Sequence, residues 1–410
     1  MSRLAINGGT PVRTRPFPRW PVWDATEKQA LIEVLESGQW GAYGQETSRV
    51  AQFEQAFARA HHARLGYCVT TGTAALETAL RAIEIDYGDE VIVPPYTFIA
   101  TASACLLVGA LPVFADIDPQ TYTLDPAQVE RAITPRTRAI IPVHIGGCPA
   151  DMDGILAVAR RHGLRVIEDA CQAHTAAWDG QRVGSIGDLG CFSFQASKNI
   201  NAGEGGIVLT SDEVLGVRCW SYRNCGRIPA GHWYQHEMLG TNHRMTEWQG
   251  AVLLAQLGRM EELARRREEN GRYLARALAE IGGFEPQARP PKVTQHAYHL
   301  FIARYHAEAF GGLPRAAFLN ALQAEGIPCS KGYVPLYDLP AIRRERGRLM
   351  RFVRGSTATD ERPRCPVTDR ACAEESVWFS QAVLLGERHD MDDIVEAITR
   401  IRRHADQVPR

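Results

Sequence analysis

The sequence predicts an α/β fold with a mostly parallel central sheet and a smaller C-terminal α+β domain. Two observations support this prediction. From about residue 64, short β-branched runs alternate with helical stretches, and each run ends in polar residues, glycine or proline. The expected strands recur roughly every 25 residues, a spacing that leaves room for a crossover helix and therefore favours parallel pairing.

The elements of this sheet can be assigned in order. One helix is expected to open at Asp125 and Pro126, because these residue types are favoured at the cap and at the first position of a helix. Strands are expected at residues 90–94, 112–117, 138–144 and 164–169, with helices between them at 101–109, 125–133 and 152–162. Two further strands, at residues 190–194 and 206–210, enclose a loop.

The residue pattern of the sequence changes after about residue 250. Residues 251–281 predict one long, arginine-rich helical segment, and residues 282–294 hold three prolines without clear periodicity. A strand is expected at residues 299–305, and helices at 313–325 and 391–404. We therefore predict an extended N-terminal arm (1–24), a large domain (25–255), and a connecting helix with a small domain (256–410).

The composition excludes several classes of function. The 46 basic and 47 acidic residues give a net charge of −1, so no excess positive charge is available to gather nucleic acid. No apolar run reaches the ~20 residues that span a bilayer, and the first residues lack a signal-peptide core. The ten cysteines include no CxxC pair. We expect a cytoplasmic enzyme without a membrane span, a metal site or a disulfide framework.

Ligands of parallel sheets bind at the carboxyl ends of the strands, where two polar segments stand out. Residues 70–73 precede a helix, and their amides and hydroxyls favour either a phosphate or a simple helix cap. Glu168 and Asp169 end a strand. A carboxylate at that position is compatible with a cationic ring nitrogen, a metal, or the cap of the next helix.

Two more strand ends carry a lysine and an aromatic pair. Lys198 is one of only four lysines, and it follows an expected interior strand and precedes the glycines of residues 203–206. A lysine amine shielded from water becomes a nucleophile that attacks carbonyl groups. Tyr96 and Phe98 follow another strand, where they either stack on a planar ring or fill the core. Together these features suit pyridoxal 5′-phosphate, PLP.

The segments that carry these residues resemble the DegT/DnrJ/EryC1/StrS aminotransferases, a fold-type I PLP group that makes amino sugars and aminocyclitols. The resemblance covers nearly the whole chain. Its matching segments are residues 71–76, 95–98, 116–119, 142–144, 149–153, 168–174, 193–194 with Lys198, 203–206, 242–245 and 298–301. The resemblance implies a fold-type I PLP-dependent transferase, with PLP held by the large domain.

The resemblance also implies roles for single residues. Lys198 would bind the cofactor aldehyde as a Schiff base and move the catalytic proton. Asp169 would hold the ring nitrogen protonated, and Gln172 would bond the phenolic oxygen. Phe98 would stack on the ring.

The phosphate contacts follow from the same resemblance. The amides of Gly72 and Thr73 and the hydroxyl of Ser193 would take the phosphate. Asn242 would reach the phosphate in the neighbouring subunit, which implies a homodimer with shared active sites. The chain departs from the family at His243, where a tyrosine or phenylalanine is usual, and mildly at Thr71, where many relatives have serine.

The implied reaction is transamination of a ketone with glutamine or glutamate as amino donor. Residues 5–13 and 365–367 resemble the subgroup that acts on inosose-type cyclitols, and also the 3-amino-5-hydroxybenzoate synthases. A nucleotide-keto-sugar aminotransferase and a non-catalytic PLP-binding regulator stay open as alternatives. His174, Arg244 and His299 are candidates for substrate contact, although each also suits a structural role.

A dinucleotide-binding oxidoreductase is a further alternative, since it too has a parallel sheet. It requires a GxGxxG motif between a strand and a helix. The nearest candidate, residues 203–208, has valine at the third glycine position and leads into a strand. The sequence therefore disfavours this class.

Overall fold

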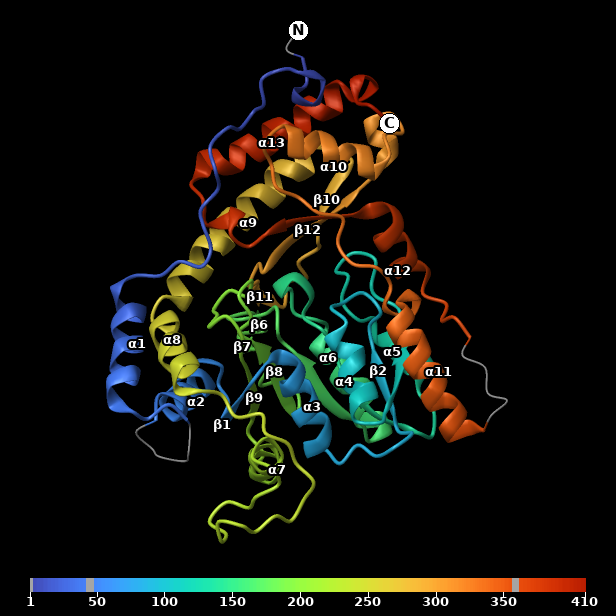
Figure 1. Ribbon diagram of the computed structural model, residues 1–410. Coiled ribbons are helices and arrows are strands. Elements are labelled where there is room, and N and C mark those ends of the chain that lie inside the picture. The colour runs from blue at the N-terminus through green and yellow to red at the C-terminus, as the bar shows by residue number, and fades with distance from the viewer. Residues whose placement is uncertain (1–2, 42–47, 356–360) are drawn as a thin grey trace.

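A computed structural model of the chain describes residues 3–41, 48–355 and 361–410 (Figure 1). Its centre is a sheet of seven strands in the order β1-β9-β8-β5-β4-β2-β3. The neighbours from β8 to β3 pair in parallel, whereas β9 is antiparallel to both β1 and β8. The strands are Leu65–Val69 (β1), Glu90–Val93 (β2), Leu111–Phe114 (β3), Thr137–Ile140 (β4), Arg165–Asp169 (β5), Leu189–Ser193 (β8) and Gly206–Thr210 (β9). The predicted mostly parallel sheet is confirmed.

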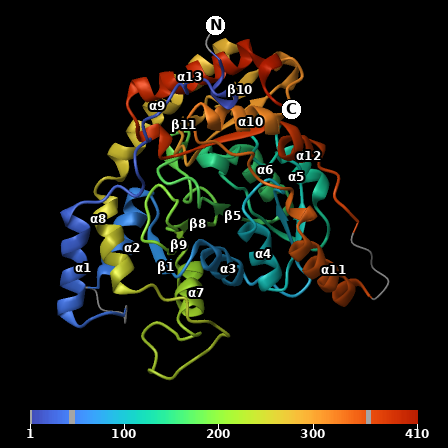
Figure 2. The same ribbon diagram turned by 45° about the horizontal axis from the view of Figure 1, so that its top comes forward.

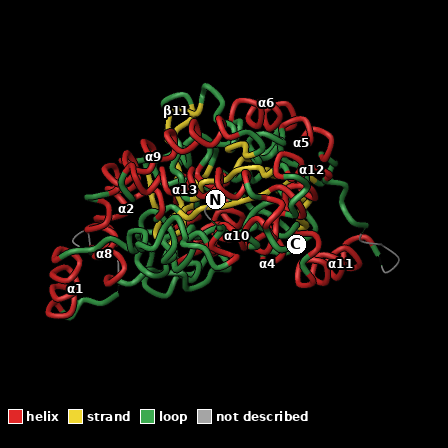
Figure 3. The backbone as a smooth tube through the Cα atoms, turned by 90° about the horizontal axis from the view of Figure 1, so that it is seen from above, coloured by secondary structure: helices red, strands yellow, loops and turns green. Residues whose placement is uncertain are grey.

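Helices cover both faces of the central sheet. In the view from above, α5 and α6 lie on the opposite side of the molecule from α4 (Figure 3). Alternate strand residues point to opposite faces, so Val91 and Val93 pack into one core while Ile92 packs into another. The first face is covered by Gly72–Ala82 (α3), Ala100–Leu107 (α4) and Glu213–Arg223 (α7). The second is covered by Arg49–Ala60 (α2), Pro126–Ala132 (α5), Met152–His162 (α6) and Glu247–Leu257 (α8).

Helix capping explains where several of these helices begin. Asp125 caps α5, where its carboxylate accepts from the amide of Ala127, and Pro126 occupies the first turn, as the sequence predicts. Asp151 caps α6 in the same way. The bounds of α6 and β9 agree with the predicted ranges, because both elements have clear stop signals in the sequence.

The predicted single helix over residues 251–281 is wrong. The structure contains two helices there, α8 and Met260–Ile281 (α9), separated at Gly258. Glycine has a low helix propensity, and Arg259, the last residue before α9, forms ion pairs with Asp24 and Glu27 at the start of α1. The break therefore follows from contacts that residues 251–281 do not reveal by themselves.

A separate antiparallel sheet and its helices enclose a second core, here called the C-terminal core. Its strands are Phe284–Pro286 (β10), Leu300–Tyr305 (β12) and Ser376–Ser380 (β13). The helices packed around it are α9, Arg315–Ala324 (α10) and Arg388–Arg403 (α13). The α+β character predicted for this part of the chain is confirmed.

The remaining elements join the two regions. Ala25–Ser37 (α1) packs on α8, and Pro340–Arg354 (α11) packs against α4 and β3. Pro366–Arg370 (α12) leads toward β13. A small sheet combines Ala177–Trp178 (β6), Gln181–Arg182 (β7) and Val293–Gln295 (β11). No helix within the described ranges is both long and apolar enough to cross a membrane.

The N-terminal arm runs from the C-terminal core toward α1, as the blue trace in Figures 1 and 2 shows. Leu4 is buried in the C-terminal core, and Arg13 forms an ion pair with Asp390 of α13 at 2.6 Å. Farther along the arm, the carbonyl of Val22 accepts from Gln256 of α8. We propose domain boundaries after residues 24 and 255, the second of which lies near the end of α8.

Candidate functional site

Asp169 ends β5 at the carboxyl edge of the central sheet. Its side chain is buried, and its Oδ2 accepts a hydrogen bond from the hydroxyl of Thr101 at 2.8 Å. Its Oδ1 accepts from the amide of Cys171 at 3.2 Å. Thr101 belongs to α4, so the first turns of that helix fix the orientation of this carboxylate.

Glu168, the other carboxylate of the strand end, has a structural role. It accepts hydrogen bonds from the amides of Gly184, Ile186 and Gly187, and it contacts His144 Nε2 at 3.0 Å. These bonds satisfy its buried charge. Of the two acids, Asp169 is therefore the one available for chemistry.

Lys198 follows β8, the strand that pairs in parallel with β5. Burial of its amine lowers the pKa of Lys198, and the proximity of Cys171 and Asp169 acts in the opposite direction. Its Nζ makes no hydrogen bond or ion pair with a described residue. An amine with a lowered pKa is more often neutral and hence more nucleophilic.

Gly72 brings the start of α3 against the same strand ends. A Cβ atom at Gly72 would lie 2.6 Å from the Cβ of Ser193 and 3.0 Å from the Sγ of Cys171, so a side chain does not fit there. Thr71 caps the helix through a bond from the amide of Ala74 at 3.1 Å. The amides of Gly72 and the following Thr73 have no acceptor within the helix, an arrangement that favours an anion.

We call Gly72, Asp169, Cys171, Ser193 and Lys198 the Lys198 cluster. The structure brings together four residues that the sequence predicts for the site. Cys171 was not predicted, although it contacts Gly72 and acts on the charge of Lys198. Its position two residues after Asp169 at a strand end was a usable signal.

Phe98 lies in the loop between β2 and α4. Its side chain is 56% exposed, and its carbonyl accepts from the amide of Thr101, the residue that holds Asp169. An exposed aromatic side chain in the loop that leads to Thr101 is available to stack on a planar ligand.

Gln172 contacts both the segment after β4 and the segment between α10 and α11. Its Oε1 accepts from the amide of Gly146 at 2.8 Å, and its Nε2 donates to the hydroxyl of Tyr333 at 2.9 Å. Tyr333 is a site residue that the sequence analysis missed. It lies in an irregular segment without periodicity, so no sequence signal could have pointed to it.

The two histidines proposed as substrate contacts are buried. His174 is enclosed by the rings of Phe57, Phe192 and Phe194. The Nδ1 of His299 lies 3.3 Å from the Oδ1 of Asn199, the residue after Lys198. Burial lowers the pKa of both histidines well below the usual value, so both rings are neutral. Their contact with substrate stays a prediction.

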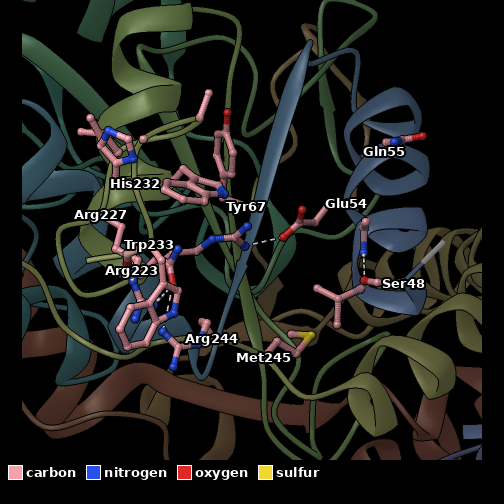
Figure 4. Close-up of a pocket in the computed structure, with 17 residues that line it drawn as sticks. Ser48, Glu54, Gln55, Tyr67, Arg223, Arg227, His232, Trp233, Arg244 and Met245 are labelled. Carbon is pink, nitrogen blue, oxygen red and sulfur yellow. Dashed lines mark hydrogen bonds and ion pairs between the residues drawn. The ribbon is translucent and has the colours of Figure 1, made fainter. Parts of the chain in front are cut away.

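Asn242 and Arg244 lie apart from these residues, in the segment 224–245. Arg244 donates to the Oδ1 of Asn224 at 2.9 Å, and Asn242 hydrogen-bonds only within its own segment among the described residues. Arg244 lines a cavity of about 780 Å³ between α2, β1, α7 and this segment (Figure 4). The ion pair of Arg223 with Glu54 crosses that cavity. The cavity does not include the Lys198 cluster.

Comparison with known proteins identifies the family. The model of the DegT/DnrJ/EryC1/StrS aminotransferase family matches residues 21–398. The chain belongs to the DegT/DnrJ/EryC1/StrS aminotransferase family. The enzyme is thus a PLP-dependent aminotransferase, and the predicted fold-type I architecture is confirmed.

Individual relatives match this aminotransferase over its full length. Two come from Streptoalloteichus tenebrarius. One, provisionally named an L-glutamine:3-amino-2,3-dideoxy-scyllo-inosose aminotransferase, is 41% identical over 99% of both chains. The other is an L-glutamine:2-deoxy-scyllo-inosose aminotransferase, 41% identical over 98% of both chains. The crystal structure of 3-amino-5-hydroxybenzoic acid synthase superposes with a TM-score of 0.86 and 34% identity, covering 96% of this chain and all of that one.

The Lys198 cluster of the aminotransferase fits PLP. It offers an amine of lowered pKa for the aldehyde and a buried carboxylate for the ring nitrogen. The close packing of Gly72 on Ser193 brings the first amides of α3 near the Ser193 hydroxyl, and these are groups that a phosphate accepts hydrogen bonds from. Phe98 exposes a ring face for the planar cofactor. The chemistry of the Lys198 cluster is therefore compatible with this cofactor.

Proposed function

We propose that this aminotransferase moves an amino group from glutamine or glutamate to a ketone on a cyclitol of the scyllo-inosose type. The observation that carries the proposal is the 41% identity, over nearly the full length of both chains, to relatives named for this reaction. The likeness extends from the N-terminal arm to the last helix, so it includes the whole site.

Bound PLP would supply an electron sink for the carbanion that forms at the substrate carbon. In our proposal Lys198 holds the cofactor covalently and, once released by the donor, moves the proton at the reacting carbon. Asp169 keeps the ring nitrogen protonated, and Thr101 fixes the orientation of Asp169 through its hydroxyl. Gln172 bonds the phenolic oxygen.

The proposal also names the residues that bind the phosphate of PLP and the residue that covers one face of its ring. The amides of Gly72 and Thr73, with the hydroxyl of Ser193, bind the phosphate, and the start of α3 adds favourable electrostatics. Phe98 covers one face of the ring and excludes water from it. These contacts position the cofactor so that Lys198 and Asp169 act at opposite ends.

The two substrates use the site in turn. The donor binds first and leaves as a keto acid, and the ketone then binds in its place and leaves as the amine. Lys198 moves a proton in both halves of the cycle, in opposite directions.

We further propose that the enzyme is a homodimer in which Asn242 serves the neighbouring subunit. The segment 224–245 projects from the molecule below α7 (Figures 1 and 2). It exposes Trp233 (77%), Tyr234 (77%) and Leu239 (92%), an unusual amount of apolar surface for one loop. A second subunit would bury this surface.

The cytoplasm as the location of the enzyme stays a prediction.

The substrate proposal is tested with PLP-loaded protein and a panel of ketones. With glutamine or glutamate as donor, we expect an amine product from 2-deoxy-scyllo-inosose or a related keto-cyclitol, detected by mass spectrometry. Turnover of a nucleotide-keto-sugar alone would favour that alternative. The 34% identity to 3-amino-5-hydroxybenzoic acid synthase makes the corresponding keto substrate a necessary member of the panel. Failure with every donor would favour a non-catalytic PLP-binding protein.

Lys198→Ala tests the catalytic assignment. We expect the rate to fall at least about 10³-fold, because the general acid–base group and the covalent link are both lost. The fold should persist, since no described residue hydrogen-bonds to the amine, and circular dichroism checks this. A variant that turns over at a comparable rate would contradict the assignment.

A further inference from the structure

Gln172 is a buried glutamine whose carboxamide is held at both of its polar atoms. The residue is 3% exposed. Its Oε1 accepts from the amide of Gly146 at 2.8 Å, and its Nε2 donates to the hydroxyl of Tyr333 at 2.9 Å. A rotated carboxamide would place Nε2 against the Gly146 amide, and both are donors, so the two bonds select one orientation. The second hydrogen of Nε2 has no acceptor among the described residues and is left for a ligand.

The hydroxyl of Tyr333 takes part in this contact as a neutral acceptor. Burial raises the pKa of Tyr333, the bond from Gln172 lowers it, and Asp169 and Cys171 raise it further. The phenol therefore stays protonated at neutral pH. Asp169 and Cys171 belong to the Lys198 cluster, so the hydroxyl of Tyr333 lies near that cluster. Gln172 is its one hydrogen-bond partner among the described residues.

The ring of Tyr333 is held by two aromatic side chains. It meets the ring of Tyr96 at 5.7 Å and the ring of Trp378 at 4.6 Å, edge to face in both cases. The Nε1 of Trp378 donates to the hydroxyl of Tyr96 at 3.0 Å, and this hydroxyl also bonds the Oγ of Ser376. Tyr96 follows β2 of the central sheet, whereas Ser376 and Trp378 belong to β13. Tyr333 therefore packs where the central sheet meets the C-terminal core.

The backbone beside Tyr333 is held as well. Ser330 exchanges two backbone hydrogen bonds with Trp378, at 3.1 and 2.9 Å. Gly332 has a φ of +83°, and a Cβ atom there would lie 2.8 Å from the indole of Trp378. Glycine permits both this conformation and this close approach. Because the ring and the backbone are both fixed, the hydroxyl of Tyr333 occupies a defined position.

We propose that Tyr333 is a positioning residue that aims Gln172 at the phenolic oxygen of PLP. The inference rests on the proposed function, in which Gln172 bonds that oxygen. A glutamine side chain is flexible, and bonds at both of its polar atoms remove this freedom before the cofactor arrives. Tyr333 acts through Gln172, so the C-terminal core influences the cofactor without touching it.

The bond from Gln172 has a measurable consequence for bound PLP. The visible absorbance of PLP joined to a lysine changes as a proton leaves the cofactor with rising pH. Negative charge then gathers on the phenolic oxygen, and a hydrogen-bond donor at this atom stabilises that charge. A well-aimed Gln172 therefore lowers the midpoint pH of the absorbance change, and loss of its alignment raises that midpoint.

Tyr333→Phe removes the hydroxyl and keeps the ring between Tyr96 and Trp378. The matched control is Tyr337→Phe, the same change between α10 and α11, at a hydroxyl that donates to Asp369 at 2.6 Å. Both proteins are loaded with PLP and titrated with pH in the absence of substrate, and circular dichroism checks their folds. We expect the midpoint to rise by about 0.5 pH unit in Tyr333→Phe and to move by less than about 0.2 in Tyr337→Phe.

A double variant tests whether Tyr333 acts through Gln172. Gln172→Met should raise the midpoint by about 1 pH unit, because the donor itself is lost. Adding Tyr333→Phe to Gln172→Met should cause no further rise, since the hydroxyl then has nothing to position. A further rise in the double variant would overturn the inference. Equal rises in Tyr333→Phe and Tyr337→Phe would overturn it too, because they would indicate a general loosening of the C-terminal core.

The outcomes separate this inference from the proposed function. An unchanged midpoint in Tyr333→Phe beside a raised one in Gln172→Met would overturn the inference alone. An unchanged midpoint in Gln172→Met would refute the contact of Gln172 with PLP, and the inference with it. Wild-type protein that binds PLP but converts no amino acid would refute the proposed transamination, while the midpoints would still decide the role of Tyr333.

Steady-state kinetics provide a second measurement. We expect Tyr333→Phe to lower the turnover number about threefold and to leave the KM for glutamine nearly unchanged, because the hydroxyl serves the cofactor and not the donor. A raised KM with an unchanged turnover number would place Tyr333 on the donor and would overturn its role as a positioning residue.

Discussion

At the scale of single residues, the proposed site depends on one carboxylate and one amine. Asp169 is held by the Thr101 hydroxyl, and Lys198 is shifted toward the neutral form by burial. Both positions follow from the sequence, because parallel strands place their carboxyl ends at one edge of the sheet. Thr101 was missed because its role depends on which helix packs beside that edge, whereas Cys171, two residues after Asp169, could have been predicted.

Thr101→Val is expected to lower the turnover number about tenfold, because loss of one hydrogen bond of ~1.4 kcal/mol lets the Asp169 carboxylate reorient. Steady-state kinetics with saturating donor and acceptor measure the effect. Ser103→Ala on the same helix is the control, since its hydroxyl contacts only the carbonyl of Ala100 at 3.5 Å. Equal rates for both variants would refute the role of Thr101.

The lowered pKa of Lys198 predicts a pH profile. In cofactor-free protein, labelling of Lys198 by an amine-reactive reagent should rise with pH and reach half its maximum below pH 10.5, the ordinary value. Asp169 acts to raise this pKa, so Asp169→Asn should move the profile to lower pH. Peptide mass spectrometry measures the label. A profile that moves to higher pH would contradict the proximity of the two groups.

The burial of Arg267 could not be predicted from the sequence. Residues 265–267 are three consecutive arginines in a helix, and nothing in the sequence separates them. The structure makes Arg265 an exposed partner of Glu269 and buries Arg267. Tyr333 is a similar case, because packing against Tyr96 and Trp378 places it on Gln172.

At the scale of elements, the sheet and α6 were predictable from periodicity and capping, whereas the α8–α9 break was not. At that break Arg259 forms ion pairs with the start of α1, a contact between segments far apart in the sequence. Two glycines at helix ends differ in how well they should tolerate a side chain. Gly72 begins α3, and Gly258 lies between α8 and α9.

Gly72→Ala should destabilise the protein by about 1–3 kcal/mol and weaken PLP binding, because the new methyl group overlaps Ser193. Gly258→Ala should stabilise it by up to about 1 kcal/mol, since Gly258 has helical angles and only a carbonyl at 3.4 Å nearby. Chemical denaturation and PLP titration measure both changes. The opposite order of stabilities would contradict the packing at α3.

At the scale of the whole molecule, the segment 224–245 exposes three large apolar side chains, those of Trp233, Tyr234 and Leu239. If it forms the dimer interface, Leu239→Asp should shift the protein toward monomers and reduce activity, because Asn242 would lose its proposed partner site. Phe352→Asp is the control, a residue of α11 that is 78% exposed on another part of the molecule. Sedimentation velocity measures the assembly. An unchanged mass for Leu239→Asp would place the interface elsewhere.

The N-terminal arm is anchored at both of its ends. Leu4 is packed into the C-terminal core, while Trp20 is bonded to the backbone just ahead of the reactive lysine. A movement of the C-terminal core relative to the central sheet would therefore change the distance that the N-terminal arm spans between Leu4 and Trp20. If the two parts separate while substrates exchange, the displacement would reach the Lys198 loop through the hydrogen bond between Trp20 and Ala196.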